Sequence, residues 1–341
     1  MTFTLGAYTA CLHNQTLGEA LDTLKGMGLN GAEVNAGGFV PSPHCPVDSL
    51  LVSKTAREEY LGVFEDKGMK LAGLNTSGNP LSPYKGTGIK HANDLKNTIK
   101  LAGLLGVEEI VCMSGLPGSD PTAKYPNWIV NPWDGIYMEM KRYQLDVAVP
   151  FWKEMDQRAQ DAGVKLAIEL HPHNLVFNPN GFMDFVELVG SKNIGVNMDP
   201  SHLMWQGLDI VKAVQYLGEH IFHVHAKDTA IEEGVATKGV LDAQFGEVPA
   251  DAPDEEKYPT GPQSWCSIWP EEPAWRFVAL GLGRNHAGVQ HDVDWWAEFL
   301  REIAKINPNM NINIEHEDKA FGSIEGLGIG AKTLLGAASK M

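Results

Sequence analysis

Short apolar runs alternate with longer helical patterns along almost the whole chain. Eight runs read as strands, at 3–9, 31–35, 70–75, 108–114, 165–170, 194–199, 221–228 and 310–317. Helical patterns lie between and after them, at roughly 16–27, 53–67, 88–105, 136–162, 181–191, 207–218, 291–305 and 323–339. Strands that alternate with helices pair in parallel through right-handed crossovers. Eight such units predict an α/β fold, a single (β/α)₈ TIM barrel over residues 1–341, in preference to an open doubly wound sheet.

The chain is longer than a minimal barrel, which needs about 250 residues. The extra residues follow strands, at about 36–52, 115–135 and, as the longest insertion, about 229–290. Such loops rise over the C-terminal face of a barrel, where barrel enzymes keep their active sites. The longest one carries Trp265 and Trp269, whose rings suit the C–H faces of a sugar, although packing of the loop alone would also explain them. Its Pro-rich, acidic stretch 249–262 predicts a solvated excursion or lid.

Composition limits the partners that the chain can have. The formal net charge is −16, which argues against nucleic acid, because phosphate contacts need clustered Lys and Arg. No run approaches the roughly 18 apolar residues of a membrane span. The N-terminus has no signal-peptide pattern, and the four scattered cysteines form no CxxC pair. We therefore expect reduced thiols and a cytoplasmic location.

Four of the expected strands end in a residue that can bind a metal ion, namely Glu169, Asp199, His225 and Glu315. The C-terminal ends of strands five to eight meet at the mouth of a barrel, so these side chains are expected to converge. Their oxygen and nitrogen donors suit one divalent ion, with Mn²⁺ preferred and Mg²⁺ or Co²⁺ as alternatives. Strand alternation places His223 on the same face as His225, one layer deeper.

The motifs KLAIELHP, NMDPSHLMWQG, IFHVHAKD, RFVALGLG with HDVDWW, and INIEHED resemble the xylose isomerase-like TIM barrel superfamily, the sugar phosphate isomerase/epimerase family. The C-glycoside deglycosidase catalytic subunits are a further branch that fits. The resemblance implies that Glu169, Asp199, His225 and Glu315 bind the metal. It also implies that Glu169 and Glu315 act as an acid/base pair and that His202 binds substrate.

Two departures from the ketose epimerases of that family affect the prediction. Leu175 and Ile231 stand where those enzymes carry a glutamate and an arginine, and the fifth-strand loop reads HPHN, with His171 and His173. Imidazoles titrate near neutral pH, so His171, His173 and His202 are alternative bases.

The preferred function is a divalent-metal-dependent sugar isomerase or epimerase, which abstracts a proton beside a carbonyl with a metal-stabilised enediolate. The alternative is a lyase that cleaves 3-oxo-glycosides by β-elimination, and a non-catalytic sugar-binding barrel is a remote third. Substrate contacts are predicted for His202, Lys227, Asp228, Trp265, Trp269 and Arg276. Glu317, His13 and Glu33 are further candidates near the pocket. We expect a carbohydrate or glycoside substrate and an oligomer, which for the lyase includes a small second subunit.

Overall fold

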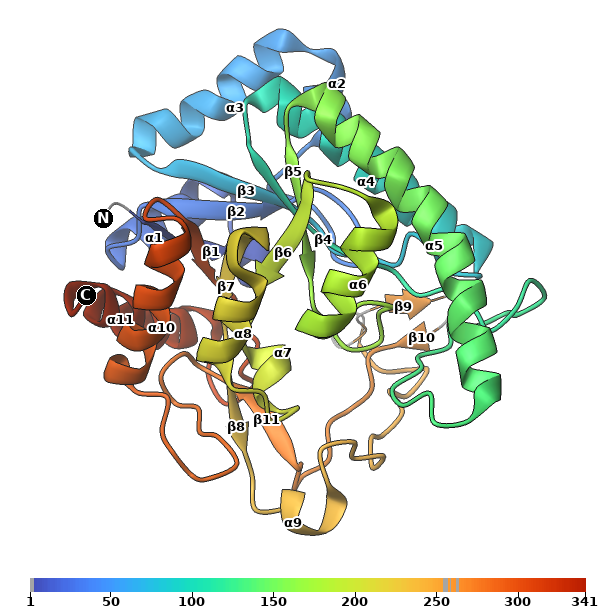
Figure 1. The fold of residues 1–341 in the computed structure, drawn as a ribbon. Coiled ribbons are helices and arrows are strands. Elements are labelled where there is room, and N and C mark those ends of the chain that lie inside the picture. The colour runs from blue at the N-terminus through green and yellow to red at the C-terminus, as the bar shows by residue number, and fades with distance from the viewer. Residues whose placement is uncertain (1–2, 254–256, 258, 262–263) are drawn as a thin grey trace.

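A computed structural model describes residues 3–253, 257, 259–261 and 264–341. Eight parallel strands close into a barrel in the order β1-β12-β7-β6-β5-β4-β3-β2, as Figure 1 shows. The barrel strands are β1 (Thr4–Tyr8), β2 (Gly31–Asn35), β3 (Lys70–Thr76), β4 (Glu109–Met113), β5 (Lys165–Glu169), β6 (Ile194–Met198), β7 (Ile221–Ala226) and β12 (Asn311–Ile314). The predicted (β/α)₈ architecture is confirmed.

Helices surround the barrel and follow the predicted segments closely. They are α1 (Leu17–Gly26), α3 (Lys54–Lys67), α4 (Lys85–Leu105), α5 (Gly135–Ala162), α6 (Pro179–Val189), α8 (Ile210–Leu217), α10 (Val293–Ile306) and α11 (Ser323–Ser339). Gly68, Gly106 and Gly163 end α3, α4 and α5 with φ values of 62°, 71° and 69°. Glycine adopts this left-handed conformation without a Cβ clash, which explains why the helices stop there.

Several short elements lie in segments that we expected to be loops. They are η1 (Thr9–Leu12), α2 (Val47–Val52), α7 (Ser201–Met204), η2 (Gly218–His220), α9 (Val235–Lys238), β8 (Asp228–Ile231), β9 (Pro259–Gly261), β10 (Ser264–Trp265) and β11 (Trp275–Val278). β8 and β11 pair antiparallel and extend with α9 beyond the barrel strands in Figure 1. The 229–290 insertion is therefore partly a β-ribbon. Of the expected excursion 249–262, residues 254–256, 258 and 262 lie outside the described residues.

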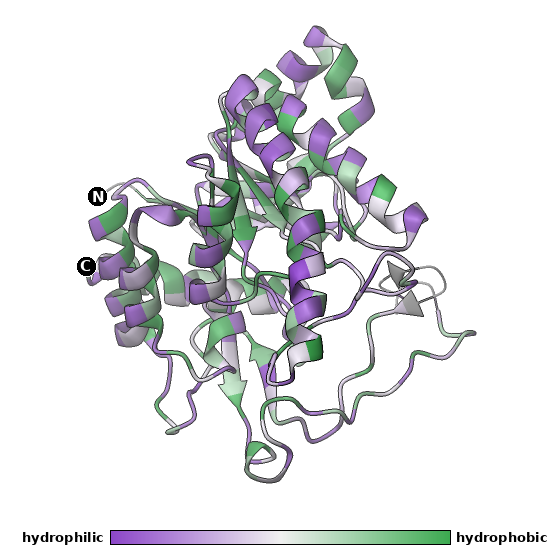
Figure 2. Cartoon of the chain, turned by 45° about the vertical axis from the view of Figure 1, so that its right-hand side comes forward, coloured by the Kyte–Doolittle hydropathy of each residue, from purple (hydrophilic) through white to green (hydrophobic). Residues whose placement is uncertain are grey.

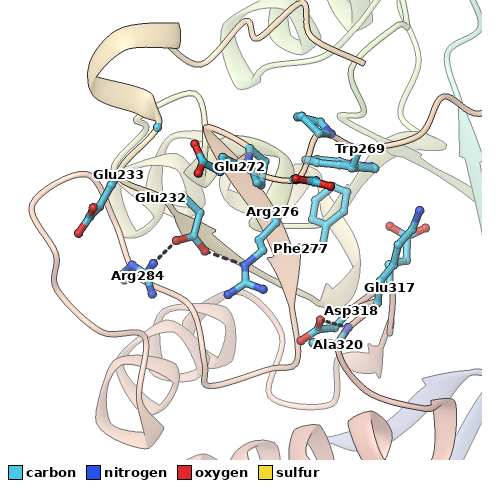
Figure 3. A pocket seen from close by; sticks show the side chains of 15 residues that line it. Glu232, Glu233, Trp269, Glu272, Arg276, Phe277, Arg284, Glu317, Asp318 and Ala320 are labelled. Atoms are coloured by element: carbon cyan, nitrogen blue, oxygen red, sulfur yellow. Dashed lines mark hydrogen bonds and ion pairs between the residues drawn. The ribbon is translucent and has the colours of Figure 1, made fainter. Parts of the chain in front are cut away.

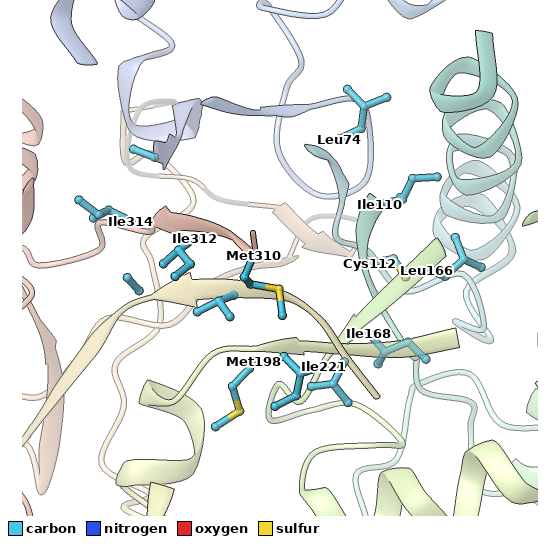
Figure 4. Packing of buried hydrophobic residues seen from close by; sticks show 14 of the residues in the cluster. Leu74, Ile110, Cys112, Leu166, Ile168, Met198, Ile221, Met310, Ile312 and Ile314 are labelled. Carbon is cyan, nitrogen blue, oxygen red and sulfur yellow. The ribbon is translucent and has the colours of Figure 1, made fainter. Parts of the chain in front are cut away.

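The apolar core lies between the strands and the outer helices. Leu166 and Ile168 of β5 belong to one buried cluster with Trp152 of α5 and Phe182 of α6, and Figure 4 shows the strand side chains of this layer. Each outer helix carries both hydrophilic and hydrophobic residues in Figure 2, as expected for helices that cover a core on one face. The other face of each strand points into the lumen, and there the buried residues include many polar ones.

No helix in the described part of the chain is long and apolar enough to cross a membrane. The four cysteines, all of them described, are unpaired.

Candidate metal centre

The four predicted metal ligands come together at the C-terminal mouth of the barrel. Glu169 ends β5, Asp199 follows β6, His225 lies near the end of β7 and Glu315 follows β12. One ligand atom from each lies within 4.8 Å of the others. Parallel strands bring these ends to the same edge of the sheet, so the geometry follows directly from strand register.

Two buried polar atoms in this group show that the residues fit a cation. Within the described residues, neither His225 Nδ1 nor Asp199 Oδ2 has a hydrogen-bond partner, although both side chains are buried. A buried polar atom without a partner is costly. His225 Nδ1 lies 3.3 Å from Glu169 Oε2 and 3.4 Å from Glu315 Oε2. A divalent cation held by the four residues would satisfy both atoms.

Three carboxylates in one buried place repel one another. Burial raises the pKa of Asp199 well above its usual value, and Glu169 and Glu315 raise it further, while Lys227 and His225 oppose the shift. Burial also works to raise the pKa of Glu315, but Lys227 and His225 outweigh it and lower that pKa to about 2. Two ionised carboxylates therefore force a proton onto the third unless a cation takes its place, which is the electrostatics expected of a metal site.

Glu33 of β2 holds both lumen histidines from below. Its carboxylate accepts hydrogen bonds from His225 Nε2, at 2.9 and 3.0 Å, and from His223 Nε2, at 2.8 Å. Asn75 Nδ2 donates to the same carboxylate at 2.8 Å. Burial works to raise the pKa of Glu33, but the two histidines hold it well below its usual range. His223 Nδ1 also lies 3.2 Å from Glu109 Oε2. His223 was predicted to lie one layer deeper in the barrel than His225, and its ring is hydrogen-bonded there.

Local sequence indicates this role of Glu33 only weakly. A glutamate inside the otherwise apolar run GAEVN is the one local signal. A buried carboxylate needs a partner, but the partner histidines lie 190 and 192 residues away along the chain.

His202 lies on α7, directly above the ligands. Its Nε2 is 3.1 Å from Glu169 Oε1 and 3.5 Å from Asp199 Oδ2. Burial and the neighbouring His171 lower the pKa of His202 to about 3, so the ring is neutral and its Nε2–H donates to Glu169. The His171 ring centroid lies 4.3 Å from that of His202, and Phe277 contacts the His202 ring edge-on at 5.3 Å.

Lys227 is a buried cation beside the ligand Glu315. Its Nζ lies 3.0 Å from Glu315 Oε2, also forms an ion pair with Glu317, and lies 4.2 Å from the centroid of the Phe277 ring. Burial works to lower the pKa of Lys227, but Glu315 and Glu317 outweigh it and hold the pKa well above its usual value. Lys227 therefore stays charged and fixes the position of Glu315.

Asp228, which we expected to orient a substrate hydroxyl, belongs to a different network. Its carboxylate accepts hydrogen bonds from the backbone N–H groups of Thr229, Gly281 and Gly283 and contacts His291 Nδ1 at 2.7 Å. The side chain is fully buried, and these partners occupy both oxygens. The structure thus assigns Asp228 to the folding of the segment that follows β11, and that expectation is corrected.

Two further predicted residues lie away from the four ligands. His173 is exposed, with a φ of 58°, and contacts Trp128 edge-on at 4.7 Å. Trp265 is partly buried, and Lys257 Nζ lies 5.3 Å from the centroid of its ring. Among the contacts of the described residues, none joins either side chain to the ligands, whereas His171 reaches them through His202.

A pocket of about 700 Å³ opens beside the centre, between the β8–β11 ribbon and the segment after β12. Trp269, Arg276, Phe277 and Glu317 line it, so two predicted substrate residues meet there. Figure 3 shows Glu317 and Asp318 on one side of Arg276 and Glu232 on the other. This space is within the usual range of ligand pockets, roughly 300–1,000 Å³.

Comparison with known proteins identifies the family. The xylose isomerase-like TIM barrel family matches residues 21–333. The chain is also 35% identical, over 306 residues, to the uncharacterized protein YfiH of Bacillus subtilis (strain 168), with 88% of each chain covered. The chain therefore belongs to the xylose isomerase-like TIM barrel family.

Solved structures share the barrel at low sequence identity. The apo form of 3-keto-D-glucoside 4-epimerase, YcjR, from E. coli has a TM-score of 0.61 and 10% identity, with 99% of this chain and 100% of that chain covered. The IOLI protein, solved with a zinc atom, has a TM-score of 0.59 and 17% identity, with 99% of each chain covered. At such identities the likeness concerns the fold alone.

Proposed function

We propose that this protein is a divalent-metal-dependent sugar isomerase or epimerase that removes a proton from the carbon beside a carbonyl. The observation that carries the proposal is the convergence of Glu169, Asp199, His225 and Glu315 within 4.8 Å at the barrel mouth. Similarity to a structure named as a sugar epimerase and to one that contains zinc adds support.

The donor set favours Mn²⁺, with Mg²⁺ or Co²⁺ as alternatives, because it combines three carboxylates with one imidazole. Such a cation supplies a Lewis acid that polarises a carbonyl and so acidifies the neighbouring C–H bond. The protein would be cytoplasmic, as its four unpaired cysteines support. We also propose an oligomer that acts on a small carbohydrate.

Glu169 and Glu315 are the proposed bases. The carboxylate of Glu169 is held by His202 at 3.1 Å and by Asn197 Nδ2 at 3.1 Å, and its side chain is only 3% exposed. Lys227 holds Glu315, whose side chain is 14% exposed. Both carboxylates are ionised at neutral pH, because their pKa values lie below the usual range despite burial. Each can therefore accept a proton at a fixed position, which general-base catalysis requires.

Deuterium exchange tests the proposal. Protein supplied with Mn²⁺ is incubated in D₂O with D-fructose, D-tagatose and methyl 3-oxo-glucosides, and NMR follows the C–H signals beside the carbonyl. Exchange without cleavage, lost on chelation and regained on addition of Mn²⁺, is the expected result. No exchange with any of these compounds by metal-loaded protein would contradict it.

One observation favours a lyase as the second candidate. The partly exposed His171 ring lies 4.3 Å from His202, whereas Leu175 and Ile231 offer no polar group where ketose epimerases have a glutamate and an arginine. In a 3-oxo-glycoside, loss of the C2 proton to this imidazole pair would expel the C1 substituent with its bonding electrons as the C1–C2 double bond forms. Release of the aglycone in the same assay, and a small second subunit that co-purifies, distinguish this activity.

A further inference from the structure

We propose that the pocket beside the candidate metal centre is a subsite for an uncharged glycosyl unit, so that the substrate is a neutral disaccharide-like glycoside and not a free or phosphorylated monosaccharide. The pocket is the one lined by Trp269, Arg276, Phe277 and Glu317. The inference rests on the proposed function, because it assigns the reacting sugar ring to the metal centre.

The pocket and the centre share side chains. The Phe277 ring lines the pocket and also contacts His202 at 5.3 Å. Lys227 bridges the two spaces, because its Nζ forms ion pairs with the predicted ligand Glu315 and with Glu317 of the pocket. A ligand whose reacting ring contacts Glu315 therefore has a neighbouring ring position beside Glu317 and Phe277.

The pocket provides more space than a substrate of one sugar ring, bound at the metal centre, would need. The 700 Å³ pocket is lined by residues other than the four predicted ligands. Pockets of this size typically enclose a ligand of drug-like dimensions. A substrate confined to the centre would leave that space filled only with water, whereas a glycoside would occupy both parts.

The charges that line the pocket disfavour a phosphate. Six acidic and three basic residues line it. Two of the cations share one carboxylate partner, because Arg276 Nε lies 2.6 Å from Glu232 Oε1 and Arg284 also pairs with Glu232. A dianionic phosphate would meet net negative charge here. Hydroxyl groups, in contrast, can donate to the carboxylates and accept from the remaining guanidinium N–H groups.

The aromatic side chains provide the apolar part of the surface. Trp269 is fixed by edge-on contacts with Trp275 at 4.8 Å and Phe245 at 5.2 Å, and Phe277 lies 6.0 Å from it. A sugar ring combines an apolar C–H face with a polar edge, which matches aromatic rings beside carboxylates and guanidinium groups. A purely aromatic group would desolvate those charged groups without pairing them, which is unfavourable.

Binding measurements test this assignment. Metal-loaded protein is titrated with cellobiose, maltose, glucose, glucose 6-phosphate and phenyl β-glucoside by isothermal calorimetry. At least one disaccharide should bind ten-fold or more tightly than glucose, and glucose 6-phosphate no tighter than glucose. Tighter binding of the phosphate or of the phenyl glycoside than of either disaccharide would overturn the proposal. So would the absence of disaccharide binding.

Two variants address the pocket itself. Trp269→Ala removes an aromatic wall, and Ala320→Phe fills the pocket from an exposed lining position without removing a side-chain contact. Each should reduce the ratio of disaccharide to glucose affinity by ten-fold. Trp133→Ala, at a tryptophan that is 88% exposed, is the matched control and should keep the ratio. An unchanged ratio in both pocket variants would show that the second ring binds elsewhere.

The subsite and the proposed function can fail independently, because binding and proton exchange are measured separately. Proton exchange on ketoses with equal affinity for glucose and disaccharides would leave the function standing and remove the subsite. A preference for disaccharides without metal-dependent exchange would keep the subsite and remove the proposed chemistry.

Discussion

Glu33 and His225 face each other across the barrel lumen, with the imidazole Nε2 2.9 and 3.0 Å from the two carboxylate oxygens. With a cation bound, this contact would keep the His225 proton on Nε2 and leave the lone pair of Nδ1, the atom that faces Glu169 and Glu315, for the cation. A carboxylate that orients a metal-binding histidine in this way fixes the tautomer of the ring and increases its basicity.

Replacement of Glu33 by Gln should therefore weaken metal binding about 10- to 100-fold, the usual effect of losing such a carboxylate. Calorimetric titration of the apo protein with Mn²⁺ measures the change. Glu58→Gln, on a side chain that is 63% exposed, serves as the control and should bind as the wild type does. Equal affinity in the two variants would show that His225 needs no partner or is no ligand.

The ligand set itself is tested by metal content. Asp199→Ala and His225→Ala each remove one donor, so after dialysis they should retain less than about a tenth of the wild-type metal, as elemental analysis measures. Addition of Mn²⁺ at 100 times its Kd should stabilise the wild type by about 2.7 kcal/mol, visible as a higher Tm, and should leave both variants unshifted. Full metal content in either variant would exclude that residue as a ligand.

Substitutions that separate base from ligand decide between the two activities. Glu169→Gln and Glu315→Gln should each lower isomerase or epimerase turnover by more than the 10²–10⁴-fold typical of a general base, because metal binding weakens as well. If a lyase operates, His171→Ala, His173→Ala or His202→Ala should abolish exchange and leave the metal bound. Because His173 is exposed, it is the weakest of the three candidates for the base. Full activity in all five variants would move the chemistry to another part of the barrel.

His91 should make folding stability sensitive to acid. Its Nδ1 accepts the backbone N–H of Asn79 at 2.9 Å, and burial together with Lys90 lowers the pKa of His91 to about 4, although Asp94 opposes the shift. The unfolded chain, with an ordinary pKa of about 6.5, binds the proton first. The stability that the neutral His91 ring contributes to the folded state is therefore complete above about pH 6.5. Between about pH 6.5 and 4 the free energy of unfolding falls by about 3 kcal/mol as this contribution is lost.

Urea denaturation of wild type and His91→Gln at pH 7 and pH 4 measures this difference. The variant should lose about 3 kcal/mol less than the wild type over that interval. Both proteins are studied without metal, so that titration of the ligand carboxylates is common to the two. Parallel losses would show that His91 keeps its ordinary titration in the folded state.

The sequence allowed the barrel, and the convergence of four metal-binding side chain types at its mouth, to be predicted, because both depend on local patterns. Residues such as Glu169 and Glu315 stand at strand ends, and parallel strands align those ends automatically. The contact of Glu33 with His223 and His225 depends on which levels of β2 and β7 face each other across the lumen, and no local pattern records that. Asp228 was misplaced for the same reason, since its partners Gly281 and Gly283 lie more than 50 residues along the chain.

The polar lumen described above joins the two ends of this barrel. TIM barrels commonly fill the interior with branched apolar side chains, so that one end serves stability and the other chemistry. Here Asn311 Nδ2 donates to Glu109 at 2.6 Å near the base, Glu109 contacts His223, and Glu33 links that histidine to His225 at the mouth. A substitution at the floor of this barrel therefore alters the electrostatic environment of the candidate metal centre, and tolerance to mutation should be low along the whole axis.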